Sequence, residues 1–213
     1  VYVTGSGNEL YEWQVAADGL VSYLRTIALP NGSDPCGVAI SSDGGKMCVC
    51  LGTRNSLAVV DVAAGSIIRE IKVGIAPWDV VLSPDNTKAY VSDWGGRYPV
   101  SGEAVANSAG TPVVIDSRGV AASGALSIVD LAAGVEAAQV PTGLHPSDIE
   151  LSPDGATLFV ANANSDTVTV IDTATHVVRE TILVRPDPAF PYGSASDGLA
   201  VSKDGQSVGC AAV

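Results

Sequence analysis

The fold is decided by the stretch Ile149-Glu150-Leu151-Ser152-Pro153-Asp154-Gly155, because its pattern, a short apolar strand followed by Ser-x-Asp-Gly or Ser-x-Asp-Asn, occurs four times in the chain. The other three copies lie at 38–44, 80–86 and 199–205. The aspartates of successive copies are 42, 69 and 50 residues apart, which indicates a repeat of about 42 residues with insertions of 27 and 8. A period of this length is typical of stacked repeat units or propeller blades.

Each repeat unit reads as four short strands. In the unit that begins with the quoted stretch, the later strands are expected at 158–161, 167–172 and 177–182, with Gly, Pro, Asn and Asp at the junctions. Four-stranded units without helical periodicity predict an all-β fold, a β-propeller. The Trp-Asp pair, Trp78-Asp79, precedes a first strand, so the WD40 subtype does not fit. A β-sandwich is the alternative, but it would not require this period.

The 213 residues are expected to form one β-propeller segment of about four repeat units. The start Val1-Tyr2-Val3-Thr4 has no initiator Met, so we expect it to lie inside a longer protein or after a cleavage site. The chain opens and closes with a second strand of a blade, so we expect 17 strands, one more than four blades use. The open sheet edges of such a partial ring need the remaining blades or a second copy to cover them. We expect a partial blade at 1–34, blades at 35–76, 77–145 (with an insertion at 93–123) and 146–195, and a partial blade at 196–213.

The composition excludes several classes of partner. Lys plus Arg number 11 against 23 Asp plus Glu, so the formal net charge is −12 and the surface repels phosphate backbones and anionic lipid. We therefore expect no nucleic-acid partner. No stretch approaches the roughly 20 apolar residues that a membrane span needs, so we expect no membrane span. A content of 46% hydrophobic and 16% charged residues is typical of a globular chain.

The four cysteines do not form a zinc-binding pattern or a disulfide scaffold. Cys48 and Cys50 would share one face of an alternating strand, where packing is favoured over a soft-metal site. Cys36 and Cys50 are expected on neighbouring strands, so one disulfide is possible. The pairing of these three cysteines and Cys210 is left open, and we expect no metal and no cofactor.

Three strand segments carry a family resemblance. Val1-Tyr2-Val3-Thr4, Ala89-Tyr90-Val91-Ser92 and Leu158-Phe159-Val160-Ala161-Asn162 resemble the Tyr-Val-Thr-Asn repeat of bacterial propellers of the YncE and surface-layer type. The resemblance implies a parent ring that is typically seven-bladed. It also implies an exported protein, periplasmic or secreted.

Three loops resemble a particular group of proteins within this family. Asp93-Trp94-Gly95-Gly96-Arg97, Asn107-Ser108-Ala109-Gly110-Thr111-Pro112-Val113 and Arg185-Pro186-Asp187-Pro188 resemble the propeller half of bacterial proteins that join a propeller to an alkaline-phosphatase-like phosphoesterase domain. In those proteins the metal and the nucleophile belong to the phosphoesterase half, and nothing resembling that half is present in this sequence. The sequence departs from the family where Cys48-Val49-Cys50 and Gly209-Cys210-Ala211 replace the usual aromatic strand.

Both insertions fall on one face of the propeller. Strands of a blade alternate in direction, so connections from the second to the third strand and from the fourth strand to the next blade emerge at the same end. We call this end the insertion-bearing face. Long connections on a regular scaffold are where binding residues concentrate. The candidate ligand- or partner-binding residues on this face are Trp78, Asp79, Trp94, Arg97, His145, Asp148, Arg185 and Tyr192.

Several of these residues allow two readings. Asp79 and Asp148 occupy equivalent positions at the mouth of the central channel, where they could bind a cation or act as acid and base. The favoured reading is that each accepts backbone N–H bonds at a loop corner, since the equivalent residues Gly37 and Gly198 carry no carboxylate. His145 could act as a base facing Asp148, but a solvated loop histidine is favoured.

The insertion also allows two readings. Its start, with Trp94 and Arg97, suits a contact surface, while Trp94 as a plug between blades is an equal alternative. The stretch 101–110 is weakly patterned and is expected to be the most mobile part of the protein.

The sequence contains no complete catalytic set. It has no nucleophile elbow, dinucleotide fingerprint, phosphate loop or His-Glu-x-x-His motif, so no catalytic residue is assigned. The leading hypothesis is a non-catalytic binding or scaffold module of a larger exported bacterial protein, which binds a protein or a small-molecule ligand on the insertion-bearing face. The alternative is a propeller hydrolase of the lactonase or phosphoesterase-associated type that uses the channel-mouth carboxylates and a metal.

Overall fold

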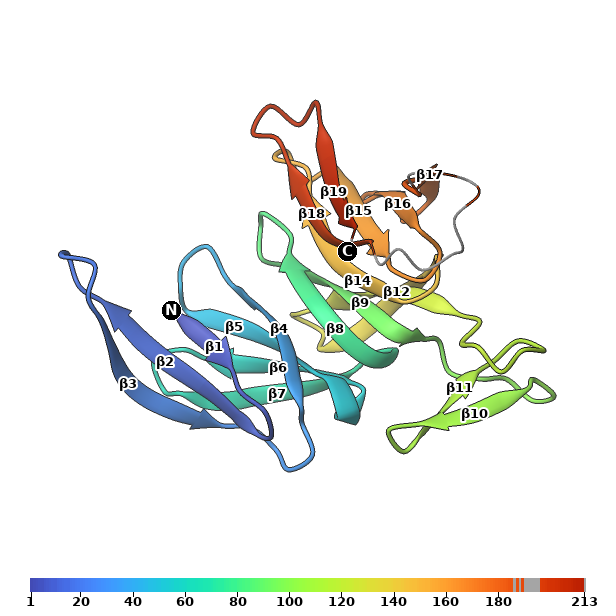
Figure 1. Cartoon of the computed structure of the whole chain (residues 1–213). Coiled ribbons are helices and arrows are strands. Elements are labelled where there is room, and N and C mark those ends of the chain that lie inside the picture. Colours follow the sequence, from blue (N-terminus) through green and yellow to red (C-terminus); the bar gives the residue numbers. More distant parts are fainter. Residues whose placement is uncertain (186, 188, 190–195, 213) are drawn as a thin grey trace.

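The computed structural model describes residues 1–185, 187, 189 and 196–212 (Figure 1). Within these residues all regular structure is strand apart from one 3-10 turn, Gly52–Arg54. Among the described residues there is also no helix with the length and apolarity to cross a bilayer. The expected all-β propeller segment is therefore confirmed.

Three complete four-stranded antiparallel sheets form the centre of the chain, and in each the strands follow one another in chain order, except that two strands of a separate sheet are inserted between the second and third strands of one of them. Blade I comprises β4 (Pro35–Ile40), β5 (Lys46–Leu51), β6 (Ser56–Asp61) and β7 (Ser66–Lys72); blade II comprises β8 (Ile75–Leu82), β9 (Lys88–Gly96), β12 (Gly124–Asp130) and β13 (Val135–Thr142); blade III comprises β14 (Pro146–Leu151), β15 (Thr157–Asn162), β16 (Thr167–Asp172) and β17 (Val178–Leu183).

Incomplete sheets flank these blades. The N-terminal sheet contains β1 (Tyr2–Thr4), β2 (Glu9–Val15) and β3 (Val21–Ala28), and the C-terminal sheet contains β18 (Ser196–Val201) and β19 (Val208–Ala212). Figure 1 shows the sheets following one another from the blue N-terminal sheet to the red C-terminal sheet. The described chain is thus a partial propeller ring.

The repeated Ser-x-Asp phrase forms the turn between the first and second strands of each blade. In blade II, the Ser83 hydroxyl donates to Asp85 Oδ1 at 2.6 Å and accepts the Lys88 N–H at 2.9 Å. Asp85 Oδ1 also accepts the Thr87 N–H at 3.1 Å, and these hydrogen bonds lower the pKa of Asp85 to about 2. The same Ser-to-Asp bond recurs in the other three copies at 2.6 Å. The sequence repeat is therefore a turn-forming repeat, and its aspartates have a structural role.

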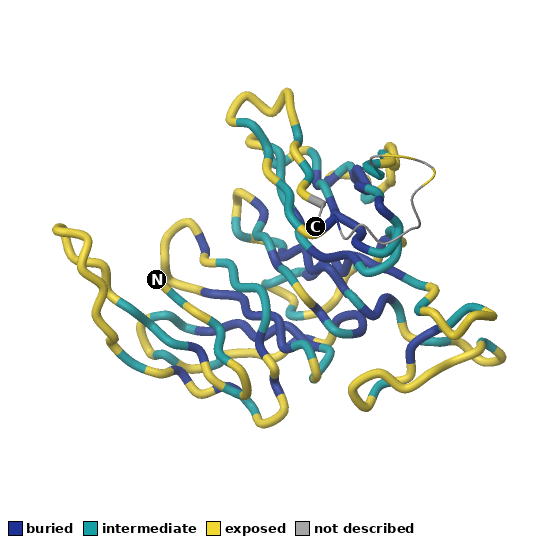
Figure 2. The backbone as a smooth tube through the Cα atoms, viewed as in Figure 1, coloured by how far each residue is buried: buried dark blue, intermediate teal, exposed yellow. Residues whose placement is uncertain are grey.

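The hydrophobic core lies between neighbouring blades, in the spaces that we call seams. Successive side chains of β5 point to opposite faces of the sheet and so pack in two different seams. Met47 and Val49 pack toward the N-terminal sheet, and Cys48 and Cys50 pack toward blade II. A third cluster, which includes Leu126 and Ile171, joins blades II and III. Figure 2 shows that buried residues concentrate in the middle of the sheets and exposed residues on the outer strands and turns.

The cysteines are not paired. Cys36, Cys48, Cys50 and Cys210 are all free thiols, so the possible disulfide between Cys36 and Cys50 is not formed. Burial raises the pKa of Cys48 to about 12 and that of Cys36 to about 11. Cys48 and Cys50 pack into the seam between blades I and II, as the packing interpretation predicts.

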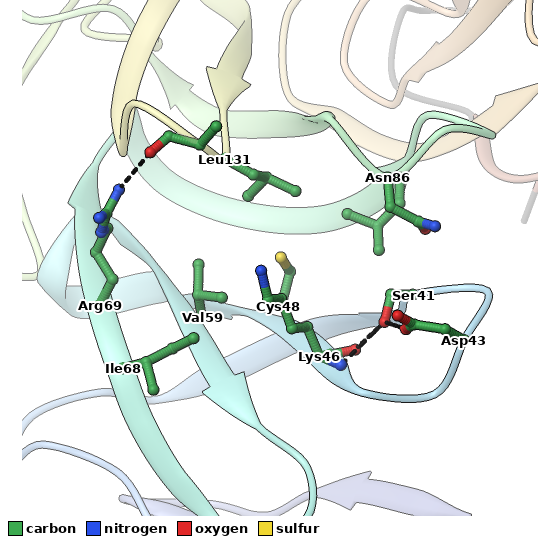
Figure 3. A pocket seen from close by; sticks show the side chains of 11 residues that line it. Ser41, Asp43, Lys46, Cys48, Val59, Ile68, Arg69, Asn86 and Leu131 are labelled. Atoms are coloured by element: carbon green, nitrogen blue, oxygen red, sulfur yellow. Dashed lines mark hydrogen bonds between the residues drawn. The ribbon is translucent and has the colours of Figure 1, made fainter.

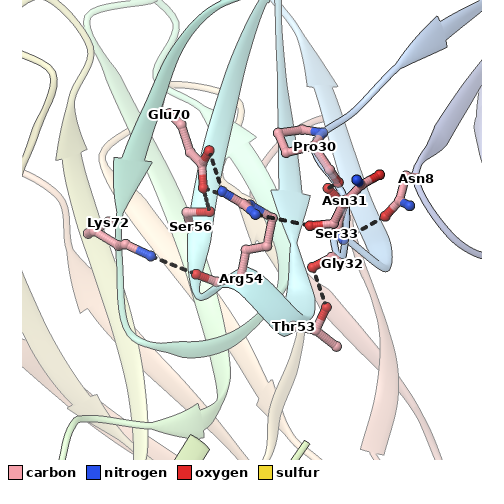
Figure 4. A network of polar contacts seen from close by, with 10 residues as sticks. All are labelled: Asn8, Pro30, Asn31, Gly32, Ser33, Thr53, Arg54, Ser56, Glu70 and Lys72. Atoms are coloured by element: carbon pink, nitrogen blue, oxygen red, sulfur yellow. Dashed lines mark hydrogen bonds and ion pairs between the residues drawn. The ribbon is translucent and has the colours of Figure 1, made fainter. Parts of the chain in front are cut away.

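A polar network ties the N-terminal sheet to blade I on the insertion-bearing face (Figure 4). The Arg54 guanidinium makes two hydrogen bonds of 3.0 Å to the Glu70 carboxylate and a third to the carbonyl of Asn31. The Thr53 hydroxyl donates to the carbonyl of Gly32 at 2.6 Å. The connection after β3 is therefore held by the connection between β5 and β6, which fixes the loop ends beside the candidate site.

The insertion of blade II is more ordered than its sequence indicates. The second strand continues through Asp93 and Trp94 to Gly96, and the stretch expected to be unpatterned contributes β10 (Val105–Ser108) to a hairpin with β11 (Thr111–Val114). The two turn residues, Ala109 and Gly110, have φ of 47° and 87°, as a type I′ hairpin turn requires. The second half of 101–110 is thus strand and turn, and the mobility expected of this stretch stays a prediction.

Candidate functional site

An aromatic cluster forms where blades II and III and the insertion meet on the insertion-bearing face. Trp78 lies on β8, Trp94 near the end of β9 and His145 just before β14. The ring centroids of Trp78 and Trp94 are 5.8 Å apart in a stacked arrangement, and those of Trp94 and His145 are 4.3 Å apart and tilted. Trp94 is thus the central ring of the three, and Trp78 is 47% exposed.

The cluster borders a pocket of about 140 Å³, which we call the aromatic pocket. The connection after β5 contributes Thr53 and Asn55 to its wall, and the turn of the hairpin contributes Ala109. Its other lining is largely apolar and includes Ile75 and Pro77. The pocket therefore lies between blade I, blade II and the insertion hairpin.

Asn55 positions the wall of this pocket. Its Nδ2 donates to the Thr111 hydroxyl at 2.9 Å, and its Oδ1 accepts the Ala76 N–H at 2.9 Å. Asn55 itself adopts a left-handed conformation with φ of 52°, which Asn tolerates better than most residues. The sequence gives no signal for this role other than an Asn in a short connection, because its partner Thr111 is 56 residues away.

The backbone at His145 is a feature of the blades and not of the site. His145 has φ of 53°, but the equivalent residues Asp34 and Ala76, each just before a first-strand proline, have φ of 43° and 51°. Only the side chain distinguishes His145. Burial lowers its pKa, so the imidazole is neutral at pH 7 and packs on Trp94 as a flat, uncharged ring.

The channel-mouth carboxylates connect first strands of successive blades. Asp79 Oδ2 accepts the Ile149 N–H at 3.3 Å, and Asp148 Oδ2 accepts the Leu199 N–H at 2.5 Å. Both of these donors belong to the next blade, and Asp79 also accepts a backbone N–H bond from Val80 on its own strand. Gly37 carries no side chain for a steric reason, since a Cβ there would lie 2.5 Å from Asp79 Oδ1.

Asp79 and Asp148 line an open cavity of about 430 Å³, bordered also by Trp78 and Asp197. Burial raises the pKa of Asp79 to about 7, and the charge of Asp148 and a hydrogen bond between the two carboxyl groups act in the same direction. Backbone N–H bonds from Val80 and Ile149 oppose the shift. The Asp79 carboxyl group is therefore partly protonated at neutral pH.

Arg97 and Arg185 do not line the aromatic pocket. Arg97 forms an ion pair with Glu103 inside the insertion, with Nη1 2.8 Å from Oε2, and lines a different cavity with Gln139. Arg185 is half-buried beyond the end of β17. Tyr192 lies outside the described residues. The structure thus brings Trp78, Trp94 and His145 together, places Asp79 and Asp148 beside them across Trp78, and separates Arg97.

No group of three or more His, Cys, Asp or Glu side chains suited to a metal ion occurs within the part of the chain that the structure describes. The channel mouth offers two carboxyl groups that already accept backbone hydrogen bonds. The aromatic pocket offers stacking surfaces and one neutral imidazole. These groups can hold a flat ligand but do not by themselves form an acid, base and nucleophile set.

Comparisons with known proteins support the fold. Hydrazine synthase of Kuenenia stuttgartiensis superposes with a TM-score of 0.66 at 22% identity, over 94% of this chain and 48% of that chain. A protein provisionally named a 6-phosphogluconolactonase, from Bacteroides uniformis, superposes with a TM-score of 0.60 at 18% identity, over 84% of this chain and 49% of that one. The chain thus spans about half the length of these two proteins, and at such identities the likeness shows the fold alone.

No curated protein sequence matches the chain. Residues 100–206, half of the chain, match the profile of the YNCE-like beta-propeller family. This stretch runs from the insertion through blade III into the C-terminal sheet and contains two of the four copies of the Ser-x-Asp turn. The protein is a member of the YNCE-like β-propeller family.

Proposed function

We propose that this chain is a non-catalytic binding module and that the aromatic pocket holds a flat apolar group of its ligand. The group belongs either to a small molecule or to an exposed side chain of a protein partner. Trp78 and Trp94 supply the stacking faces, and neutral His145 adds a third flat surface. We further propose that the module is part of a larger exported bacterial protein, periplasmic or secreted.

The observation that carries this proposal is the identity of residue 94. The equivalent residues, at the end of the second strand in blades I and III, are Gly52 and Ala163. A blade of this protein therefore does not need a large side chain there. Trp94 is half-buried and borders an unfilled pocket, which favours a binding role over the alternative of a plug between blades.

The test measures binding of a flat-ring probe and stability together. Indole is titrated into ¹⁵N-labelled protein, and the side-chain N–H signals of Trp78 and Trp94 are followed by NMR. The shifts should saturate in the wild type and vanish in Trp94→Ala. Trp13→Ala is the matched control, because Trp13 stacks edge-on with Tyr23 at 5.6 Å in the N-terminal sheet, away from the pocket.

Two outcomes would contradict the proposal. One is wild-type probe binding by Trp94→Ala accompanied by a fall of several degrees in the melting temperature, which would assign Trp94 to packing. The other is the absence of probe-induced shifts at both tryptophans. A shared effect of Trp13→Ala and Trp94→Ala would identify binding that does not involve the pocket.

The second candidate function is hydrolysis at the channel mouth. The observation that favours it is the raised pKa of Asp79, about 7, which leaves this carboxyl group partly protonated and able to donate or accept a proton near pH 7. The Bacteroides uniformis protein, whose provisional name is that of a lactonase, shares the fold. Lactone and phosphoester hydrolysis should be assayed with and without divalent cations, and activity that Asp148→Asn abolishes would replace the binding proposal.

A further inference from the structure

A second pocket lies in the seam between blades I and II, on the opposite face from the insertion (Figure 3). It has a volume of about 320 Å³ and opens between the Ser-x-Asp turns of the two blades and the turn after β12. We call it the seam pocket. The Ser-x-Asp turns contribute Ser41 and Asn86, and the turn after β12 contributes Leu131.

Comparison of the seams explains why a pocket exists there. The third residue of the second strand is Tyr90 in blade II and Phe159 in blade III, but Cys48 in blade I. Tyr90 is 3% exposed and packs with Leu158 in the seam between blades II and III. Its hydroxyl lies near the Thr173 side chain, in the turn after β16.

Leu131 occupies the position in the turn after β12 that Thr173 occupies in the turn after β16. An aromatic ring at position 48 would therefore extend to Leu131, which lines the seam pocket. The blades are held at their spacing by the rest of the seam, including Cys50, Val80 and Val91. A cysteine in place of an aromatic residue therefore leaves space that the sheets do not close. The seam pocket has the position of a missing phenol ring.

The walls of the pocket are apolar in the middle and charged at the ends. Cys48, Val59 and Ile68 form the apolar part, and Arg69 lies at one end of the view in Figure 3. Lys46 lies close enough to Cys48 for its charge to lower the pKa of that thiol against the effect of burial. Two of the chain's 11 basic residues thus line one pocket of a protein with a net charge of −12.

The three charged side chains at the pocket differ in the number of hydrogen bonds that they make. Asp43, at the other end, accepts the Ser41 hydroxyl at 2.6 Å and the Gly45 N–H at 2.9 Å. Arg69 donates to the Ala132 carbonyl at 3.2 Å. The Lys46 ammonium has no hydrogen-bond or ion-pair partner within 4.0 Å among the described residues. The formal charges of Lys46, Arg69 and Asp43 sum to +1, so the net charge at the pocket is positive.

From these observations we propose that the seam pocket binds a monocyclic aromatic carboxylate, whose ring occupies the place of the missing phenol and whose carboxylate pairs with Lys46 and Arg69. The volume is sufficient, since an apolar cavity of about 150 Å³ is enough to bind benzene. Hydrogen bonds between a carboxylate and Lys or Arg are among the stronger kinds in proteins. This site is separate from the aromatic pocket and does not rest on the function proposed for it.

The test is a calorimetric titration of the whole chain with 4-hydroxybenzoate at low salt. Saturable one-to-one binding is expected. Lys46→Ala should weaken it about tenfold, the loss expected when one charged hydrogen bond is removed. Lys88→Ala is the matched control, because Lys88 begins the second strand of blade II, whose seam Tyr90 already fills, and it should leave the affinity unchanged.

Filling the pocket gives a second, independent arm. Cys48→Tyr should abolish binding and raise the melting temperature, because the new ring occupies the site. If Cys48→Tyr does not fold, Cys48→Leu, which adds less volume, should still reduce the affinity. No heat of binding in the wild type, or an affinity that neither Cys48 variant changes, would overturn the proposal. Phenol should bind equally to the wild type and Lys46→Ala; a loss of phenol binding in Lys46→Ala would overturn the pairing of Lys46 with the carboxylate.

Discussion

Replacing Asp79 with asparagine should stabilise the protein at neutral pH and remove part of its pH dependence. The amide side chain of the Asp79→Asn variant would keep an oxygen to accept the Ile149 N–H, and its NH₂ group could donate to the Asp148 carboxylate. It would not need a proton from solution. The wild-type carboxyl, by contrast, has a pKa of about 7 in the folded protein, against about 4 in an unfolded chain.

The magnitude follows from the difference between these pKa values. Because the folded pKa is raised, the unfolded state loses its proton first, and the free energy of unfolding falls as the pH rises from about 4 to about 7. A difference of about 3 at 1.36 kcal/mol per pK unit gives a penalty of about 4 kcal/mol at pH 7 and less than about 1 kcal/mol at pH 4. This is an upper limit, because Asp79 borders an open cavity.

The assay is urea unfolding of the wild type and Asp79→Asn at pH 4, 5.5 and 7. The two proteins should be similar at pH 4, and the variant should be more stable at pH 7 by on the order of 2–4 kcal/mol. Asp197→Asn is the control, since Asp197 lines the same cavity but is exposed, and it should change neither value. An unchanged difference between Asp79→Asn and the wild type from pH 4 to pH 7 would refute the raised pKa of Asp79.

Three further predictions follow from contacts of the described residues. Gly37→Ala should lower the free energy of unfolding by about 2 kcal/mol or more in urea melts, because its Cβ would lie 2.6 Å from the Asp79 Cα; an unchanged midpoint would show that the two strands can move apart. Asn86→Ala should lower the free energy of unfolding in urea melts by about 1–2 kcal/mol, since it removes two exposed hydrogen bonds to Ser42 that join blades I and II and places Ala at a φ of 55°. Asn86→Asp should lower it less, because one carboxylate oxygen can accept the Ser42 N–H and the other the Ser42 hydroxyl. Ellman's reagent should titrate four thiols in the unfolded protein and react slowly with Cys48 in the native one; fewer than four would indicate a disulfide.

The blade repeat was predictable because its hydrogen bonds are local. The hydrogen bonds among Ser152, Asp154 and Thr157 form the turn within six residues, so the sequence motif alone predicts the structure of the turn. The alternating pattern of β5 could likewise be read along one strand. The insertion was less predictable, since Ala109-Gly110 is not among the favoured two-residue hairpin turns and 101–110 has little hydrophobic alternation.

The candidate site depended on distances that a sequence does not contain. Trp78, Trp94 and His145 were placed on the same face from strand direction alone, but that reasoning placed Arg97 there equally, and the structure directs Arg97 to Glu103 instead. The carboxylates were expected to accept backbone N–H groups at a loop corner, and both do accept backbone N–H groups. They accept N–H groups of the next blade, because the first strands of neighbouring blades converge at the channel, a contact that spans 70 residues for Asp79.

In a repeat fold each residue can be compared with the residues at equivalent positions of the other blades. This comparison distinguishes residues that maintain the blade structure from residues of a binding site. Asp79 and Asp148 perform the same bonding in successive seams, so their presence is explained by holding first strands together. The left-handed backbone at His145 is explained in the same way by its equivalents. Trp94 and Cys48 are different, because Trp94 is large where its equivalents in blades I and III are small, and Cys48 is small where its equivalents in blades II and III are aromatic. Trp94 borders the aromatic pocket on the insertion-bearing face, and Cys48 borders the seam pocket on the opposite face. The geometry of a blade requires neither residue. Each of the two residues leaves a pocket that an aromatic ring of a ligand can fill.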